Sequence, residues 1–368
     1  MQEENGLGRR CGLWHGHRAA SWSGAVAGVL LAGMALASGR ASAALPTTQQ
    51  AIVQTGHGGP EVLQLRSIPV LAPGNGHVLL QVQAAAINPV DWHFRETGKG
   101  DASLIPGYDV AGRVAALGAG VSSLQVGEAV FGVTGRDEVG GLNGAYAQYV
   151  VVPADFLVAK PANISFEEAA GLGTATLAGI RVVDQLHVQP GERVLITGVA
   201  GGVGSAAAQT ALARGARVIG TASPRHADYL HQLGVQFIDY AQSDWAARAR
   251  AAMPQVVIDT VGADTAASVF GLLARGGRFV SVAAHDYTPE KCRASDVICP
   301  PGGSVVGGPV PTALLLHEAA QLAASGRLRV HVDRAYPLAQ AGAAQEFNRE
   351  GHTEGKVVLA IGSAAAGR

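Results

Sequence analysis

Charged residues, aromatic residues and cysteines are all scarce in this chain of 368 residues. Charged residues make up 15% and aromatic residues 5% of the sequence, and the formal net charge at pH 7 is −1. No block of lysine and arginine runs through the body, so the basic footprint of a nucleic-acid-binding protein is absent. Because 48% of the residues are hydrophobic, the chain can bury a large core and is long enough for two domains.

The chain contains only three cysteines, which are Cys11, Cys292 and Cys299. None of them lies in a C-x-x-C pair, which excludes a zinc ribbon and a thioredoxin-type redox site. Cys292 and Cys299 lie seven residues apart in a segment rich in proline and glycine, and we interpret them as unpaired thiols. A disulfide between them is expected only if the protein is exported.

The apolar run at residues 24–37 is too short for a membrane-spanning helix. Three arginines precede it within residues 9–18, and small residues follow at 41–43, as in a cleavable export signal. The pattern predicts a signal peptide at 1–43 and favours a periplasmic or otherwise exported protein. The paired arginines match the twin-arginine route only weakly. The alternative is translation from Met34, which would leave a cytoplasmic protein.

Short apolar stretches separated by glycine and proline dominate the first part of the chain. We expect strands at 50–55 and 78–86, and the second contains the alternating pattern of a half-buried strand. Residues 106–112 and 144–151 continue this pattern. Short strands joined by glycine turns predict a compact, barrel-like β domain.

The pattern changes after Pro161, where Ser165 and Glu168 form a capping box before an alanine-rich helix. Apolar strands then alternate with helices. We expect strands at 193–197, 217–221, 235–240, 256–260 and 278–283, and helices at 205–214 and 225–233. This alternation predicts a buried parallel sheet.

The two patterns together predict an α/β protein in which one domain is inserted into another. The β-rich domain takes residues 44–165 and 309–368, and the parallel-sheet domain takes residues 166–308. A helix from about 311 to 325 and a strand at 355–359 belong to the second piece of the β-rich domain.

A glycine-rich turn follows the strand at 193–197 and enters a helix of small residues. Such a turn binds the pyrophosphate of a dinucleotide on the free N–H groups and positive dipole end of the helix. The predicted binding residues are Ala200, Gly201, Gly202, Val203 and Gly204. Val199 stands where the fingerprint has its first glycine, so the prediction depends on the strand–turn–helix context. The alternative is a tight turn without a ligand.

The second parallel strand identifies the expected dinucleotide. No aspartate or glutamate follows it to bind the ribose 2′-OH of NAD. Ser223 and Arg225 stand there instead, and a guanidinium suits a phosphate dianion. The sequence therefore predicts NADP(H). The alternative for Arg225 is a solvated residue at the start of the next helix.

Six motifs together resemble the zinc-independent quinone oxidoreductase branch of the medium-chain dehydrogenase/reductase superfamily, over about residues 50–360. They lie at residues 86–91, 106–112, 200–204, 259–262, 276–278 and 352–359. The resemblance implies a GroES-like β-rich catalytic domain with an inserted Rossmann doubly wound parallel-sheet domain. It also implies hydride transfer from NADPH to a quinone or α,β-unsaturated carbonyl, and a homodimer formed by edge pairing of the nucleotide domains.

The resemblance also allows the zinc-ligand positions of related enzymes to be compared with this sequence. Zinc alcohol dehydrogenases of the superfamily place Cys where Asn88 stands and Gly-His-Glu where residues 107–109 stand, and they carry a four-cysteine lobe. A catalytic zinc needs three such ligands and one open position. Asn88 and Tyr108 cannot replace a thiolate and an imidazole, so we predict no metal.

Without a metal, hydrogen bonds must polarise the substrate carbonyl and stabilise the charge that develops on its oxygen. The candidate catalytic residues are Asn88, His93 and Tyr108. His93 lies where quinone oxidoreductases often carry a tyrosine, and it offers a donor that titrates near neutral pH. The alternatives are a turn-capping amide for Asn88, a surface or packing position for His93 and a core position for Tyr108.

The resemblance implies three further cofactor contacts. Thr174 would precede the helix that lines the nicotinamide pocket, Tyr240 would stack near the adenine, and Lys356 would contact the cofactor or a hinge, with a solvated lysine as the alternative. Asp259 most simply ends a strand. A second function class stays open, a non-catalytic NADPH-binding protein like the lens crystallin relatives of this branch. Turnover of NADPH with quinones or enones separates the two classes.

Overall fold

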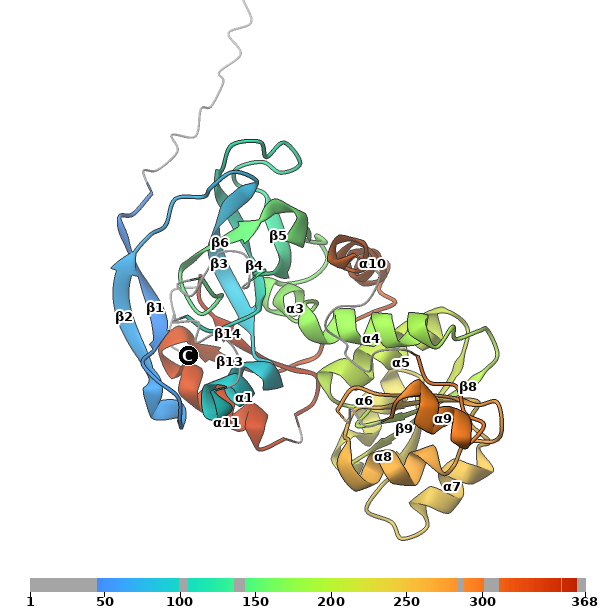
Figure 1. Ribbon diagram of the computed structural model, residues 1–368. Coiled ribbons are helices and arrows are strands. Elements are labelled where there is room, and N and C mark those ends of the chain that lie inside the picture. The colour runs from blue at the N-terminus through green and yellow to red at the C-terminus, as the bar shows by residue number, and fades with distance from the viewer. Residues whose placement is uncertain are drawn as a thin grey trace, which may run out of the picture. The chain divides into compact units, whose positions relative to one another are not determined.

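The computed structural model of the protein describes residues 45–98, 105–135, 143–283, 287–300, 311–351 and 353–362 (Figure 1). The predicted signal peptide at 1–43 and His352 of the closing motif lie outside these residues. Within the described part of the chain, no helix is both long enough and apolar enough to cross a membrane.

A seven-stranded sheet forms the β-rich part of the chain (Figure 1). Its strands run in the order β13-β14-β3-β4-β5-β7, with β6 paired to β3, and all pairs except β13 with β14 are antiparallel. The strands are β3 (His77–Ala86), β4 (Asp109–Leu117), β5 (Ala129–Val133), β6 (Tyr149–Pro153), β7 (Leu157–Ala159), β13 (Val332–Pro337) and β14 (Lys356–Ala360). A separate hairpin pairs β1 (Thr48–Gln54) with β2 (Leu63–Pro69). The C-terminal strands therefore complete a sheet that the N-terminal strands begin.

Strand β3 supplies side chains to two hydrophobic clusters. Leu80 and Val82 pack in one cluster, whereas Ala84 and Ala86 pack in the other. A register shift between Val82 and Ala84 changes which side chains face each cluster. Four helices accompany this sheet: α1 (Pro89–Thr97), α3 (Phe166–Ala170), α10 (Thr312–Ala324) and α11 (Ala341–Arg349).

The predicted capping box at Ser165 is confirmed. The Glu168 N–H donates to Ser165 Oγ at 3.0 Å, and the Ser165 N–H donates to the Glu168 carboxylate at 2.7 Å. The helix that they start, α3, ends at Ala170, and α4 (Thr174–Gln185) begins after a short break. The single helix expected here is therefore two.

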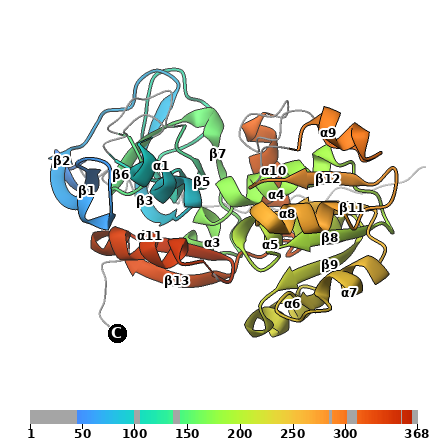
Figure 2. The same ribbon diagram turned by 60° about the horizontal axis from the view of Figure 1, so that its bottom comes forward.

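The five-stranded sheet of the parallel-sheet part is entirely parallel, with the order β10-β9-β8-β11-β12 (Figure 2). Its strands are β8 (Arg193–Thr197), β9 (Arg217–Ala222), β10 (Gln236–Asp239), β11 (Val256–Asp259) and β12 (Arg278–Ser281). Helices α4, α5 (Gly202–Ala213) and α6 (Ala227–Gln232) pack on one face. Helices α7 (Trp245–Ala251), α8 (Ala263–Phe270) and α9 (Pro289–Ala294) pack on the other. The predicted doubly wound fold is confirmed.

Cys292 and Cys299 form a disulfide, so the interpretation of two unpaired thiols was wrong. A turn after α9 returns the chain, because the Val297 N–H donates to the Cys292 carbonyl at 3.0 Å. Ile298 then makes a bridge to Arg278 at the edge of β12. This reversal brings the two cysteines together, and the proline and glycine content of the segment did not reveal it.

Candidate functional site

The glycine turn joins β8 to α5 and has two different requirements for glycine. A Cβ on Gly204 would lie 2.4 Å from the Gly198 carbonyl oxygen and 2.7 Å from Val199 Cα, so only glycine allows this helix–strand approach. A Cβ on Gly201 would meet only the Gly198 oxygen, at 3.4 Å. The space above Gly201 is open at the N-terminus of α5, where N–H groups attract anions.

Val199 fits in the turn because Gly220 faces it from β9. A Cβ on Gly220 would lie 2.4 Å from Val199 Cγ1, and the valine side chain is fully buried. The volume of the valine is therefore accommodated by the absence of a side chain on the neighbouring strand, which accounts for the departure from the glycine fingerprint.

The residues predicted to bind the 2′-phosphate and to stack near the adenine lie at the carboxyl ends of two neighbouring strands. Ser223 follows β9 and Arg225 is exposed two residues later. Tyr240 follows β10, is 45% exposed, and donates its N–H to the Ala222 carbonyl at 3.4 Å. This edge of a doubly wound sheet is where dinucleotide ligands bind.

A buried polar cluster lies beside this turn, centred on Asn88, Asp109 and Lys356. Asn88 Nδ2 donates to Asp109 Oδ2 at 2.9 Å, and Lys356 Nζ donates to Asn88 Oδ1 at 2.6 Å and to the Ile87 carbonyl at 2.9 Å. Lys356 Nζ also lies 3.7 Å from Asp109 Oδ2. The Asn88 amide therefore binds two charged side chains, and Lys356 is buried, so the solvated alternative for it was wrong.

Asp109 connects the cluster to α4. Its Oδ1 accepts the Thr174 N–H at 2.8 Å and the Thr174 hydroxyl at 2.5 Å, at the first turn of that helix. A carboxylate is stabilised there by the helix dipole. The sequence reasoning missed this role of Asp109, although the residue lies in one of the motifs, because its partners are 21 and 65 residues away.

Asp91 is the second carboxylate of the cluster. Its Oδ2 accepts the Asn88 N–H at 2.8 Å and the Tyr146 hydroxyl at 3.1 Å, whereas its buried Oδ1 has no hydrogen-bond partner among the described residues. Burial raises the pKa of Asp91 to about 7, and the nearby Asp109 acts in the same direction. Burial also raises the pKa of Tyr146 well above its ordinary value.

Lys356 shows the opposite effect. Burial lowers the pKa of its ammonium group, and this effect is opposed by the negative charges of Asp109 and Asp91. The Lys356 amino group is therefore buried close to the Asp109 carboxylate, where burial and the neighbouring negative charge act on its pKa in opposite directions.

His93 and Tyr108 lie outside this hydrogen-bonded cluster. His93 is exposed on α1, with its ring near those of Trp92 and Phe94. Tyr108 is half-buried immediately before Asp109, and its carbonyl accepts the Thr134 N–H at 2.8 Å. Of the predicted residues, the structure therefore brings together Asn88, Thr174 and Lys356.

The polar cluster and the glycine turn are in direct contact. The Gly355 N–H donates to the Ala200 carbonyl at 2.8 Å, and Gly201 forms a parallel bridge with Gly355. A Cβ on Gly202 would lie 3.0 Å from Lys356 Cδ. The two features therefore make one continuous candidate site.

Asp259 does more than end β11. Its carboxylate accepts the hydroxyls of Thr197 on β8 and Ser281 on β12, each at 2.6 Å, and the Gly262 N–H at 2.9 Å. It thus ties together the carboxyl ends of three strands. Sequence reasoning alone could not identify these partners on separate strands.

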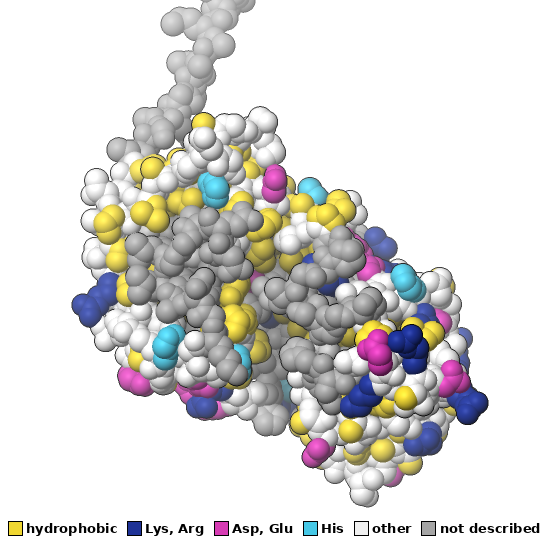
Figure 3. Space-filling model, in the orientation of Figure 1, with side chains coloured by type: hydrophobic (Ala, Val, Ile, Leu, Met, Phe, Trp, Pro, Cys, Tyr) yellow, Lys and Arg dark blue, Asp and Glu magenta, His cyan; other side chains and the backbone are white. Residues whose placement is uncertain are grey.

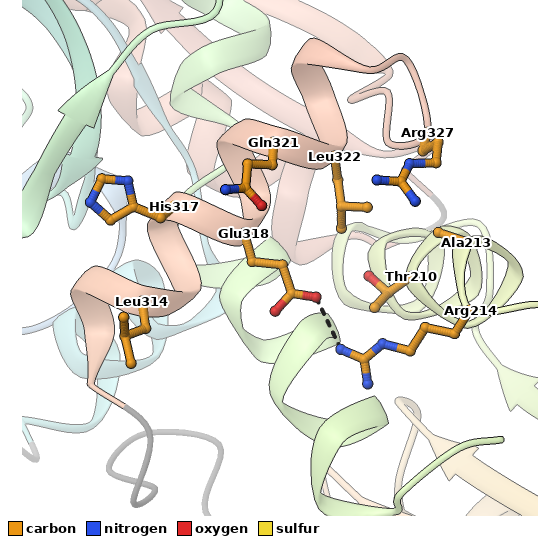
Figure 4. Close-up of a pocket in the computed structure, with 9 residues that line it drawn as sticks. All are labelled: Thr210, Ala213, Arg214, Leu314, His317, Glu318, Gln321, Leu322 and Arg327. Atoms are coloured by element: carbon orange, nitrogen blue, oxygen red, sulfur yellow. Dashed lines mark hydrogen bonds and ion pairs between the residues drawn. The ribbon is translucent and has the colours of Figure 1, made fainter. Parts of the chain in front are cut away.

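A cavity of about 410 Å³ lies away from this site, between the C-terminal end of α5 and α10 (Figure 4). Arg214 and Glu318 pair across it at 3.0 Å. It lies at the opposite end of α5 from the glycine turn.

Acidic and basic side chains are intermixed on the face of the parallel-sheet part that Figure 3 shows.

Comparisons with known proteins identify the family. The family described as alcohol dehydrogenase GroES-like domain matches residues 74–162, and that described as zinc-binding dehydrogenase matches residues 233–359. The quinone oxidoreductase of Sus scrofa is 31% identical over 327 residues, covering 83% of this chain and 95% of the relative. The chloroplastic NADPH-dependent alkenal/one oxidoreductase of Arabidopsis thaliana is 30% identical over 336 residues, covering 87% and 81%.

A solved structure agrees with these relatives. The quinone oxidoreductase from Coxiella burnetii superposes with a TM-score of 0.74 at 30% identity, covering 85% of this chain and 99% of that chain. The chain belongs to the medium-chain dehydrogenase/reductase superfamily, as its motifs predicted. It is an oxidoreductase of a family that uses a nicotinamide cofactor.

Proposed function

We propose that the protein transfers a hydride from NADPH, without a metal, to a quinone or an α,β-unsaturated carbonyl compound. The observation that carries this proposal is the contact between the glycine turn and the buried Asn88–Asp109–Lys356 cluster through Gly355. This contact supports the proposal, because it joins a turn of the type that binds dinucleotides to polar groups that can act on a substrate.

The described residues fit a dinucleotide phosphate. The open space at Gly201 and the N-terminus of α5 suit the pyrophosphate, while Ser223, Arg225 and Tyr240 would hold the adenosine end with its 2′-phosphate. Thr174 and Lys356 would serve the nicotinamide end. When bound, the cofactor supplies the hydride, and the protein supplies position and electrostatics.

The residues do not fit a catalytic zinc. Asn88 and Asp109 hydrogen-bond to each other, and the ammonium of Lys356 lies against Asn88 Oδ1 and the Ile87 carbonyl. This arrangement of an amide, a carboxylate and a carbonyl around an ammonium contains neither thiolate nor imidazole, the ligands typical of such a zinc site. The proposed reaction therefore uses no metal.

The chain's own groups can perform two tasks. The positive charge of Lys356 and the amide of Asn88 stabilise negative charge that develops nearby on a substrate oxygen. Asp91, with its pKa of about 7, exchanges a proton near neutral pH beside the Tyr146 hydroxyl. His93 and Tyr108 stay candidates for the group that delivers a proton to the substrate.

The test is NADPH oxidation by chelator-treated protein with a panel of quinones and enones. We expect consumption with at least one acceptor class and no gain when zinc is added. Product analysis then separates two-electron saturation of a C=C bond from one-electron formation of a semiquinone. Saturable NADPH binding without consumption by any acceptor would support the non-catalytic alternative.

The choice of NADP(H) has its own test in Arg225→Asp. This change removes the phosphate partner and supplies a carboxylate suited to the 2′-OH of NAD. We expect NADPH binding to weaken at least about a hundredfold relative to NADH binding, as for loss of charge-assisted hydrogen bonds. Arg217→Asp, at the exposed opposite end of β9, is the matched control. Equal effects on the two dinucleotides would refute the 2′-phosphate role.

We further propose that residues 44–165 and 309–368 form the β-rich domain and residues 166–308 the parallel-sheet domain. Two copies would pair at the edge of the nucleotide domain to form a homodimer. Residues 1–43 would direct export. The Cys292–Cys299 disulfide supports export, because disulfides persist in oxidising compartments. Fractionation of expressing cells with N-terminal sequencing tests export. A cytoplasmic protein that begins at Met34 would contradict it.

A further inference from the structure

A buried histidine stands between Arg225 and the C-terminal segment of the chain. His226 is 5% exposed, whereas Arg225, which precedes it in the 3₁₀ turn Pro224–His226 after β9, is exposed. Arg225 Nε donates to His226 Nε2 at 3.1 Å, and His226 Nδ1 lies 2.8 Å from Glu354 Oε2. The three side chains therefore form a chain of contacts.

The chemistry of the three groups fixes the direction of this chain. A guanidinium Nε can only donate, so His226 Nε2 accepts and the ring hydrogen lies on Nδ1. The Nδ1–H then donates to the Glu354 carboxylate. A guanidinium is a rigid plane, so a hydrogen bond at its Nε fixes the plane in which its terminal nitrogens lie.

Glu354 is also held in place by residues other than His226. Its backbone N–H donates to Asp333 Oδ2 at 2.9 Å, and its Oε1 lies 3.4 Å from His331 Nε2. The next residue, Gly355, donates its N–H to the Ala200 carbonyl in the glycine turn. The carboxylate that orients His226 is thus anchored beside the pyrophosphate site.

We propose that His226 and Glu354 are positioning residues that orient Arg225 for the 2′-phosphate and so set the preference for NADP(H) over NAD(H). This inference rests on the proposed NADP(H) function. An arginine side chain is costly to order, and holding its guanidinium plane in advance lowers the entropy cost of phosphate binding. Neither residue needs to touch the cofactor.

The same contacts connect the proposed adenosine end of the site with its proposed nicotinamide end. Glu354 lies two residues before Lys356, and Gly355 between them binds the glycine turn. One short segment therefore contacts the Arg225–His226 pair, the turn and the Asn88–Asp109 cluster. The preference for the phosphorylated dinucleotide is accordingly set by residues far apart in the sequence.

The experiment compares NADPH and NADH dissociation constants for the full chain carrying His226→Phe or Glu354→Gln. Phenylalanine keeps a ring but accepts no hydrogen bond, so we expect NADPH binding to weaken about tenfold and NADH binding to change less than about twofold. Glu354→Gln keeps the shape and lowers the charge, so its effect on NADPH has the same sign and is smaller. His231→Phe, exposed on α6, is the matched control.

A merely structural role would lower the affinity for both dinucleotides equally. The double variant Arg225→Asp with His226→Phe makes the test sharper, because once the arginine is gone the phenylalanine should cause no further loss of NADPH affinity. Wild-type protein that binds neither dinucleotide would refute the proposed function and this inference together. Wild-type protein that prefers NADPH, with the preference unchanged in both single variants, would overturn the inference alone.

Discussion

At the scale of single residues, Val199 and Gly220 show how a turn can lose a fingerprint glycine. The valine side chain occupies the space that a side chain at Gly220 would fill. The glycine fingerprint is a pattern of residues next to one another in the sequence. The residue that makes room for Val199 is Gly220, which lies on the neighbouring strand β9. A sequence pattern therefore identified the turn but could not explain its departure.

This pairing predicts that Val199 and Gly220 are coupled. Gly220→Ala places a methyl group against the valine and should cost about 1–3 kcal/mol of unfolding free energy. Val199→Ala should cost on the order of 2 kcal/mol through the cavity that it leaves. In the double variant the new methyl enters that cavity, so urea titration should give a cost at least about 1 kcal/mol below the sum. Simple additivity would contradict the packing.

Asp91 predicts a pH dependence of stability. Its pKa is about 7 in the folded protein and 3.8 in the unfolded chain, so the folded state holds the proton more tightly. Its contribution to stability is full below about pH 4 and is lost as the pH rises through about 7. Asp91→Asn keeps an acceptor for Asn88 and Tyr146 but cannot ionise. Between pH 4 and pH 7 the variant should gain up to about 4 kcal/mol relative to the wild type, as measured by urea titration at each pH.

A constant difference between Asp91→Asn and the wild type over that range would contradict the raised pKa. Asp155→Asn is a suitable control, because Asp155 is exposed and lies in the same β-rich part. Its variant should follow the wild type across the range.

At the scale of elements, local patterns predicted most of the fold. The strand predicted at 193–197 is β8, Arg193–Thr197, because an apolar run bounded by a charged residue and a glycine turn is a local signal. The helix expected at 205–214 begins earlier, at Gly202, because the glycines are part of its first turn. The break between α3 and α4 and the register shift in β3 depend on contacts between distant residues, and no local pattern marks them.

The glycine turn predicts different outcomes for two alanine substitutions. Gly204→Ala would place a methyl group 2.4 Å from the Gly198 carbonyl oxygen, so the helix and strand must move apart. The change should cost at least about 2 kcal/mol and abolish dinucleotide binding. Gly201→Ala has room for its methyl group, so thermal unfolding should change little while dinucleotide affinity falls, because the methyl group hinders approach to the backbone. Equal destabilisation of the two variants would contradict the geometry of the turn.

The disulfide is a further element-scale feature. It closes a short loop that ties α9 to the bridge at β12. Replacing both cysteines by serine should cost about 2 kcal/mol through the greater freedom of the unfolded chain. Urea titration under non-reducing conditions measures this, and adding a reductant should lower the stability of the wild type alone. Three free thiols per unfolded, unreduced wild-type chain, rather than the one that Cys11 supplies, would show that no bridge forms.

At the scale of the whole molecule, the segment of Glu354, Gly355 and Lys356 decides how the site is assembled. The sequence predicted Lys356 as a cofactor or hinge contact, and the structure shows it buried in contact with Asn88. Asn88 and Lys356 are 268 residues apart, and His226 and Glu354 are 128 apart. The turn, the second strand and the family could be predicted from local patterns. The partners of these charged groups could not, because only the folded topology brings them together.

Metal-free hydride transfer from NADPH can be followed with a labelled hydride. Chelator-treated protein is given NADPH that carries deuterium at nicotinamide C4, together with an acceptor that it reduces. For an enone, we expect one deuterium at the β-carbon of the product, and the same rate of reduction with and without added zinc. Reduction that requires added zinc would contradict metal-free hydride transfer. Product that carries no deuterium, whichever of the two C4 hydrogens of NADPH is replaced by deuterium, would contradict it as well.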